Sequence, residues 1–248
     1  MHYDYLIVRK GSVLAAFLKG SYPEVFPNEF ESLVSGCAQT DVTWRRPVAL
    51  LANRRCHTWC MASLPDQLHG ARLVLRRWSL DAIDDALAAI DDSFEELHTW
   101  MSWAETMPTR DSLVAIVYDG NERFDSGERW AYFVREKEGG RLVGSASLGR
   151  RGGDRELEIG YWVRSDRTGR GYATEAAKIL TSAAFDSALD VGTVKISMDR
   201  ANLASAAVPR KLGFTLDDEY EREVITPGHS GRGIAWIISR EEWQSITS

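Results

Sequence analysis

The sequence predicts a mixed α/β domain that extends from Met61 to the end of the 248-residue chain. Several short runs of alternating apolar and polar residues, bounded by glycine-containing turns, predict mostly antiparallel strands. Between them, apolar residues recur at helical spacing, which predicts helices that each bury one face. With 44% hydrophobic and 27% charged residues, the chain has the composition of a protein that buries a core.

The first half of this domain has the pattern of one strand, then helices, then a hairpin. Residues 71–76 have a β-like pattern, and Ser79 suits the N-cap of a following helix. Apolar side chains then keep helical spacing, and Pro108 begins a further helix. A Glu-Gly-Gly turn separates two strand patterns, 130–136 and 142–148.

The second half alternates strands with helices. A strand at 155–163 precedes a helix with an apolar stripe of small residues, chiefly alanines between Ala173 and Ala184, which allows the helix to lie close to a sheet. The remaining predicted elements are a strand at 194–198, a helix at 203–212, and strands at 214–224 and 234–238.

Residues 1–60 differ from the rest of the chain, because their apolar clusters show no sustained period of 2 or 3.6. Three interpretations stay open: an ordered N-terminal extension, a disordered one, or a start misassigned upstream of Met61. All three cysteines lie here, and Cys56, His57 and Cys60 resemble half of a zinc site. No second pair of ligands follows at a finger-like distance, so we expect no bound metal.

The charge and hydropathy of the chain limit its partners. A net charge of −6 and a pI near 5.5 argue against general nucleic-acid binding. No apolar run is long enough to span a bilayer, and the stretch 13–18 is too short for a secretory signal. We therefore expect a cytoplasmic protein without membrane partners, and the sequence leaves open whether it is a monomer or a homodimer.

A glycine loop joins the strand at 155–163 to the small-residue helix. Its sequence is Thr168-Gly169-Arg170-Gly171-Tyr172-Ala173. Backbone N–H groups at a helix start point outward and carry partial positive charge, and glycines let an oxyanion approach the backbone closely. The loop is therefore a candidate pyrophosphate cradle, although a tight turn without a ligand has the same pattern.

Four segments in a fixed order resemble the GNAT superfamily of N-acetyltransferases. They are Glu158-Ile159-Gly160-Tyr161-Trp162-Val163, the glycine loop continued through Thr174-Glu175-Ala176, Asn202-x-x-Ser205, and Lys211-Leu212-Gly213-Phe214. The resemblance covers about residues 69–240 and is strongest to the RimJ/RimL-like branch, the ribosomal-protein N-acetyltransferases. It implies a GNAT fold, in which a mixed, mostly antiparallel sheet is splayed at its centre and carries helices on both faces.

In that superfamily, the glycine loop binds the pyrophosphate of acetyl-CoA, and the strand before the loop pairs with the pantetheine arm. The resemblance therefore implies acetyl-CoA as the co-substrate and a binding site made of Trp162, Val163, Thr168, Gly169, Arg170, Gly171, Tyr172, Ala173 and Asn202. The family pattern usually has Gln or Arg where this chain has Thr168. Arg167 and Arg170 keep positive charge nearby.

Glu158 and Ser205 are the catalytic candidates. An amine must be neutral before it attacks a thioester, so a base is required near the acceptor, acting directly or through water. The resemblance implies that role for Glu158, and protonation of the leaving CoA thiolate for Ser205. Each also has a structural interpretation: Glu158 as a polar residue on the wetter strand face, like Glu156, and Ser205 with Asn202 as a helix N-terminus. Pro209 removes the helical hydrogen bond to the Ser205 carbonyl, which predicts a kink or a later helix start.

Trp100 and Trp103 are the candidates for acceptor binding, because the first helices of the superfamily overhang that site. Aromatic residues at helical spacing also suit a core. Nearby acidic residues would attract a cationic amine or form a solvated helix face. These are Asp84, Asp85, Asp91, Asp92, Glu95 and Glu96.

The implied function is transfer of acetyl from acetyl-CoA to a primary amine, either a protein N-terminus or a small amine. No cysteine follows Cys60, so we expect direct attack in a ternary complex without a cysteinyl intermediate. The alternative is a non-catalytic acyl-CoA-binding module that acts as a sensor or scaffold.

Overall fold

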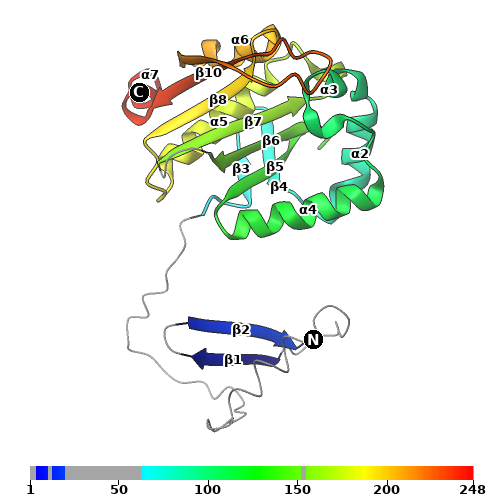
Figure 1. Ribbon diagram of the computed structural model, residues 1–248, viewed down its shortest axis with the longest axis vertical. Helices are drawn as coiled ribbons and strands as arrows, with labels where there is room; N and C mark the ends of the chain where they lie inside the picture. The colour runs from blue at the N-terminus through cyan, green and yellow to red at the C-terminus, as the bar shows by residue number, and fades with distance from the viewer. Residues whose placement is uncertain (1–3, 11–12, 20–62, 152–154, 248) are drawn as a thin grey trace. The chain divides into compact units, whose positions relative to one another are not determined.

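The structure is a computed structural model that describes residues 4–10, 13–19, 63–151 and 155–247 (Figure 1). The chain divides into two units, Met1–Cys56 and His57–Ser248. Within the first unit, β1 (Asp4–Lys10) pairs antiparallel with β2 (Val13–Lys19). The sequence pattern did not predict this hairpin. The three cysteines lie outside the described residues.

The second unit is built on one sheet of eight strands, in the spatial order β3-β4-β5-β6-β7-β8-β10-β9. Every neighbouring pair is antiparallel except β7 and β8, which run parallel. The strands are β3 (Gln67–His69), β4 (Leu73–Arg77), β5 (Arg129–Glu136), β6 (Leu142–Arg150), β7 (Glu156–Val163), β8 (Thr193–Asp199), β9 (Thr215–Glu221) and β10 (Arg232–Ser239).

The sheet opens between its two parallel strands. β7 and β8 pair only as far as Ile159 and Ile196. Beyond that point β7 continues to Val163 paired with β6 alone, and β8 continues to Asp199 paired with β10 alone. The expected splay at the centre of a mixed, mostly antiparallel sheet is thus confirmed, and it leaves one edge of β7 without a strand partner.

Helices cover both faces of the sheet, as expected. On one face, α2 (Ile83–Asp91) and α4 (Arg110–Asp125) pack with the short α3 (Phe94–Trp100) around a first core that includes Ile83, Val117 and Phe133. On the other face, α5 (Tyr172–Asp186), α6 (Leu203–Lys211) and α7 (Arg240–Thr247) contribute to a second, larger core.

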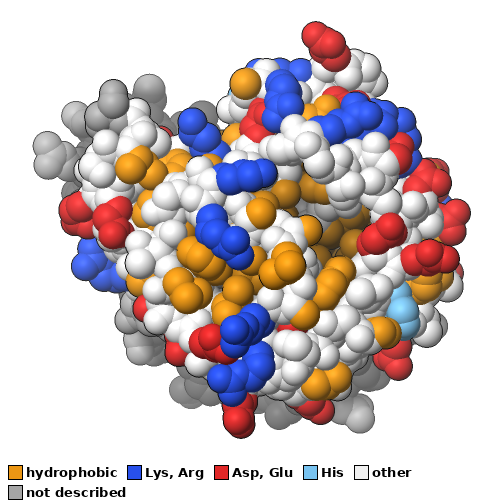
Figure 2. Space-filling view, turned by 90° about the horizontal axis from the view of Figure 1, so that it is seen from above, with side chains coloured by type: hydrophobic (Ala, Val, Ile, Leu, Met, Phe, Trp, Pro, Cys, Tyr) orange, Lys and Arg blue, Asp and Glu red, His pale blue; other side chains and the backbone are white. Residues whose placement is uncertain are grey.

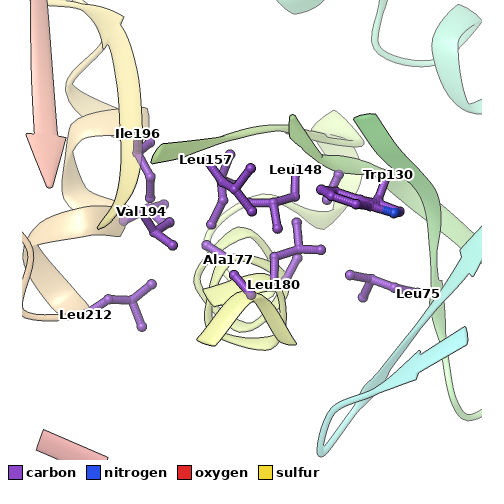
Figure 3. Packing of buried hydrophobic residues seen from close by; sticks show 14 of the residues in the cluster. Leu75, Trp130, Leu148, Leu157, Ala177, Leu180, Val194, Ile196 and Leu212 are labelled. Carbon is purple, nitrogen blue, oxygen red and sulfur yellow. The ribbon is translucent and has the colours of Figure 1, made fainter. Parts of the chain in front are cut away.

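The second core shows why α5 is built from small residues. Ala177 and Leu180 are fully buried and point toward Leu157 of β7 and Val194 of β8 (Figure 3). Alanines along the contact allow the helix axis to come close to the parallel strands, and the loop of residues 164–171 joins β7 to the start of α5. The sheet and the glycine loop are therefore positioned by the same packing.

Three local features differ from the sequence expectations. Ser79 makes no side-chain cap; it precedes a single 3-10 turn, Leu80–Ala82, and α2 begins only at Ile83. The short edge strand β3 and the C-terminal α7 were not predicted. α7 joins the core chiefly through one side chain, Trp243, and a single anchor leaves little periodic signal in a sequence.

Candidate active site

The glycine loop leaves an array of free backbone donors at the start of α5. Gly169 and Gly171 have φ angles of 72° and 79°, the left-handed region that glycine adopts without strain. Counting from Gly169, the first backbone N–H with an intramolecular acceptor is that of Glu175, which donates to the Gly171 carbonyl at 2.9 Å. The N–H groups from Gly169 to Thr174 have no acceptor among the described residues, and no side chain caps the helix. These donors and the helix dipole suit a phosphate group.

An arginine and a glutamate far apart in the sequence hold this loop in place. The Arg72 guanidinium, at the start of β4, donates to the Arg170 carbonyl at 2.9 Å and to Glu175 at 2.8 Å. The Glu175 carboxylate also accepts the backbone N–H groups of Arg72 and Leu73. Burial would raise the pKa of Glu175, but these hydrogen bonds outweigh it and lower the pKa below its ordinary value. The sequence motif contained Glu175, but nothing in it indicated the partner.

The positive charge near the loop is distributed unequally. Arg167 donates to Glu136 at 3.2 Å and to Asp166 at 3.1 Å, so its charge is compensated within the fold. Tyr172 also donates to Glu136, at 2.7 Å, and the Thr168 hydroxyl donates to the Ser165 carbonyl. The side chain of Arg170 is exposed and has no ion pair among the described residues. Of the two arginines that the sequence offered, only Arg170 remains available to a ligand.

Ser205 lies against the open part of β7 and is held there by Tyr161. The Tyr161 hydroxyl donates to the Ser205 carbonyl at 3.1 Å and lies 3.2 Å from the Ser205 Oγ. This is the carbonyl that Pro209 deprives of its helical partner, so the phenol replaces the missing N–H. Burial raises the pKa of Tyr161 to about 12, so the phenol stays protonated at neutral pH and keeps its donor.

The N-terminus of α6 agrees with the structural interpretation of Asn202. Its Oδ1 accepts the backbone N–H of Ser205 at 2.9 Å and thereby caps the helix. α6 begins at Leu203 despite Pro209, so the predicted later start was wrong. The cap uses only the Asn202 oxygen, so the structure leaves the side-chain amide N–H groups for another partner.

A cavity of about 500 Å³ brings several of the predicted residues together. Its walls include Trp100, Trp103, Trp162, Asn202 and Ser205. The Trp103 and Trp162 rings lie 6.3 Å apart, and Trp103 remains 45% exposed. Seen from above, the molecule has a hollow with hydrophobic side chains in its depth and both basic and acidic side chains on the surrounding surface (Figure 2). The two acceptor candidates and Ser205 therefore border one space.

The roof of this cavity joins two distant segments of the chain. The loop between β9 and β10 reaches α3, where the Gly228 N–H donates to the Thr99 carbonyl at 2.9 Å. A Cβ at Gly228 would come within 2.7 Å of that carbonyl oxygen and 2.9 Å of the Trp100 ring, so the approach requires glycine. The contact joins two segments that both line the cavity, α3 through Trp100 and the loop through His229.

Glu158 lies on the expected strand face but does not line the cavity. It is opposite Gly149 on β6 and Lys195 on β8, and its nearest cation is Arg151, at 3.9 Å. It stands two residues before Gly160, which does line the cavity, a separation of roughly 7 Å along a strand. Glu158 therefore lies next to the cavity lining on its strand face without belonging to it.

The acidic residues of the first helices are engaged elsewhere. Asp84 pairs with Arg110, Asp85 with Arg135, and Asp92 with Arg164, and Glu96 accepts the Ser165 hydroxyl. None of the six acidic residues in and between α2 and α3 lines the cavity. The structure therefore favours the interpretation that these carboxylates form a solvated helix face, and not an attraction site for a cationic amine.

The comparisons with known proteins agree with this geometry. Residues 72–215 match the family described as "Acetyltransferase (GNAT) domain", which is more than half of the chain. The chain belongs to the GNAT acetyltransferase family.

Relatives of the GNAT domain are found among ribosomal-protein acetyltransferases. The provisionally named ribosomal N-acetyltransferase YdaF of Bacillus subtilis (strain 168) is 29% identical over 91 residues, 37% of this chain and 49% of that protein. The match thus spans about half the length of this curated relative. The RimL ribosomal L7/L12 α-N-protein acetyltransferase, solved with coenzyme A, has a TM-score of 0.64 at 16% identity and covers 70% of this chain and 97% of its own. Mycobacterium smegmatis RimJ, solved with CoA-disulfide, has a TM-score of 0.64 at 23% identity, covering 72% and 89%.

Two further observations concern other ligands of this GNAT protein. Over the described ranges, no three His, Cys, Asp or Glu side chains gather in a way that would hold a metal ion. No helix in the described part of the chain has the length and apolar character needed to cross a membrane.

The Tyr161–Ser205 contact predicts a specific coupling with Pro209. Tyr161→Phe should lower the free energy of unfolding by about 1–3 kcal/mol, because it leaves a half-buried carbonyl without a partner. In a Pro209→Ala background the restored N–H can take that carbonyl, so the same change should cost less. A double-mutant cycle by denaturant unfolding measures the coupling. Tyr118→Phe, at a 59% exposed position on α4, serves as the control. Equal costs of Tyr161→Phe in both backgrounds would contradict this assignment.

Proposed function

We propose that this protein transfers an acetyl group from acetyl-CoA to a primary amine by direct attack in a ternary complex. One observation carries the proposal: the strand that precedes the loop of free N–H groups also supplies the unpaired edge beside the cavity. A single extended ligand with a pyrophosphate at one end and a thioester at the other fits that arrangement. Acetyl-CoA supplies the activated acyl group when bound.

The residues proposed to hold acetyl-CoA form one continuous path. The loop from Thr168 to Ala173 would bind the pyrophosphate through its free backbone N–H groups and the exposed Arg170. Trp162 and Val163, on the open edge of β7, would pair with the pantetheine arm. The free amide of Asn202 would contact the same arm from α6. The solved relatives that contain CoA support this path by their fold.

Ser205 is proposed to protonate the leaving thiolate. Its hydroxyl borders the cavity and lies 3.2 Å from the Tyr161 hydroxyl, which keeps its proton at neutral pH. The phenol donates to the Ser205 carbonyl and lies beside the Ser205 hydroxyl, so it fixes the position of the serine oxygen. This arrangement supports Ser205 as the acid and gives Tyr161 a positioning role.

Glu158 is proposed as the general base, acting through a water molecule. Its place on the same face of β7 as Gly160, which lines the cavity, supports this assignment. The acceptor is an amine, either a protein N-terminus, as the names of the ribosomal-protein relatives suggest, or a small molecule. The absence of cysteine beyond Cys60 supports direct attack without an acyl-enzyme.

Acetyl-CoA should raise the melting temperature of the protein, and Gly171→Val should abolish that shift. A ligand that binds only the native state stabilises it, and a side chain at Gly171 would block approach of the pyrophosphate to the backbone. Gly139→Val is the matched control, since Gly139 has the same left-handed backbone, with φ 74°, and no neighbour within 4 Å. Both variants should lose roughly 1–2 kcal/mol from backbone strain. A full shift in Gly171→Val would show that the cradle lies elsewhere.

Glu158→Gln should lower kcat/KM for an amine acceptor by roughly 10²–10⁴, the usual range for general acid–base catalysis. Part of the rate should return at high pH, where free amine is more abundant, and the acetyl-CoA thermal shift should persist. Glu156→Gln, on the same strand face and paired with Lys195 at 3.9 Å, is the control and should be mild.

The readout is CoA release, measured alongside the unfolding curve of each variant. Ser205→Ala should slow turnover without loss of the helix cap, because the cap uses the backbone N–H of that residue. Full activity of Glu158→Gln at every pH would remove Glu158 from the mechanism. Acetyl-CoA binding without CoA release from any amine would favour the non-catalytic alternative.

A further inference from the structure

Two arginines border the acceptor cavity without a carboxylate partner in the described part of the chain. Arg222 follows β9 at the base of the roof loop, where its N–H donates to the Gly231 carbonyl at 3.1 Å. Its side chain is half-buried and makes no hydrogen bond or ion pair with any described residue. Arg129, at the start of β5, lies over Gly149 and donates to the Ser147 hydroxyl at 3.0 Å.

The carboxylate in the cavity wall does not compensate these cations. Asp199 is the acidic residue among the lining side chains of the described structure. Its two oxygens already accept the Ala201 N–H at 2.8 Å, the Ser230 N–H at 3.0 Å and the Ser230 hydroxyl at 2.7 Å. The acidic helices α2 and α3 contribute no carboxylate to the wall. The polar part of the cavity is therefore positive, although the chain as a whole carries a net charge of −6.

We infer that the acceptor is an amine that also carries an anionic group, a carboxylate or a phosphate, which Arg222 binds while Arg129 adds positive charge to the wall. This inference rests on the proposed acetyl transfer and specifies its substrate class. An unpaired, half-buried guanidinium is a ready partner for such a group, since a charge-assisted hydrogen bond is stronger than a neutral one.

The same cations assist the chemistry of the amine. Neighbouring positive charge disfavours an ammonium ion, so an amine held in this cavity loses its proton more readily than in water. The neutral nitrogen then forms a bond to the acetyl carbon, the C–S bond breaks, the nitrogen gives its second proton to the base, and the CoA thiolate takes a proton. The anionic group is unchanged and only anchors the acceptor.

Matched acceptors test this inference. β-Alanine is compared with β-alaninamide, and the C-terminally amidated peptide Ser-Glu-Ala-Ala with Ser-Gln-Ala-Ala, so that each pair differs only in one negative charge. The two pairs distinguish a small acceptor from a peptide N-terminus. The wild-type protein should give the higher kcat/KM with the charged member of at least one pair.

Arg222→Gln should lower kcat/KM for the charged member by roughly 10- to 100-fold, the range expected when a hydrogen bond to a charged group is lost. The neutral member should change by less than about 3-fold. Arg129→Gln should also lower kcat/KM for the charged member, but by a smaller factor, because Arg129 also contacts Ser147. Arg232→Gln is the control, since Arg232 pairs with Glu219 at 3.4 Å and does not line the cavity.

The outcomes separate this inference from the proposed function. The inference of an anionic acceptor would be wrong if the wild-type protein turned over neutral and charged members at equal rates. It would also be wrong if Arg222→Gln affected both members equally. Neither result would contradict acetyl transfer itself. Loss of the acetyl-CoA thermal shift together with no CoA release from any amine would instead overturn the proposed function. A charge preference that disappears in Arg222→Gln and persists in Arg232→Gln is the expected result.

Discussion

The point at which β7 and β8 stop pairing determines the rest of the site. The two strands share hydrogen bonds only through Ile159 and Ile196, and each then follows its other neighbour. Unpaired backbone groups in a protein interior are costly, so a sheet that opens at its centre requires something else to occupy the gap. Here Tyr161 and α6 occupy part of it, and the remainder is the edge proposed for acetyl-CoA.

Packing on the opposite face makes this opening stable. The alanine-rich side of α5 lies against the paired parts of β7 and β8, so both strands are anchored before they diverge. The loop of residues 164–171 connects the end of β7 to the start of this helix. Arg72 and Glu175 then connect the loop to the start of β4. One helix thus holds the strands together and presents the phosphate cradle.

Most of the fold was predictable from the sequence, because its elements have strong local patterns. The alternation in β7, the alanine stripe of α5 and the glycines of the loop each indicate their structure within a few neighbouring residues. Pro209 indicated a disturbed helix. Of the two predicted consequences, the later start was wrong, and the sequence did not indicate that a phenol from β7 takes the freed carbonyl. Contacts between residues 44 or 103 positions apart, as for Tyr161 with Ser205 and Arg72 with Glu175, leave no local pattern to detect.

The charge of the cavity wall was also not predictable from the sequence. The sequence left two interpretations of the acidic residues near the first helices, an attraction for a cationic amine or a solvated helix face. In the structure none of them lines the cavity, and four of them pair with arginines or with the Ser165 hydroxyl. The wall instead carries Arg129 and Arg222, from two elements about ninety residues apart. Electrostatic character at a site depends on which side chains the topology brings together, and net charge does not report it.

The central claim is that the open edge of β7 and the start of α5 together bind acetyl-CoA. Amide hydrogen exchange of the full chain, with and without saturating acetyl-CoA, tests it directly. Amides on the open edge, within 160–163, and those from Gly169 to Thr174 have no intramolecular acceptor to protect them, so bound acetyl-CoA should slow their exchange in both segments at once. The account would be contradicted if acetyl-CoA slowed exchange elsewhere in the chain but in neither of these two segments.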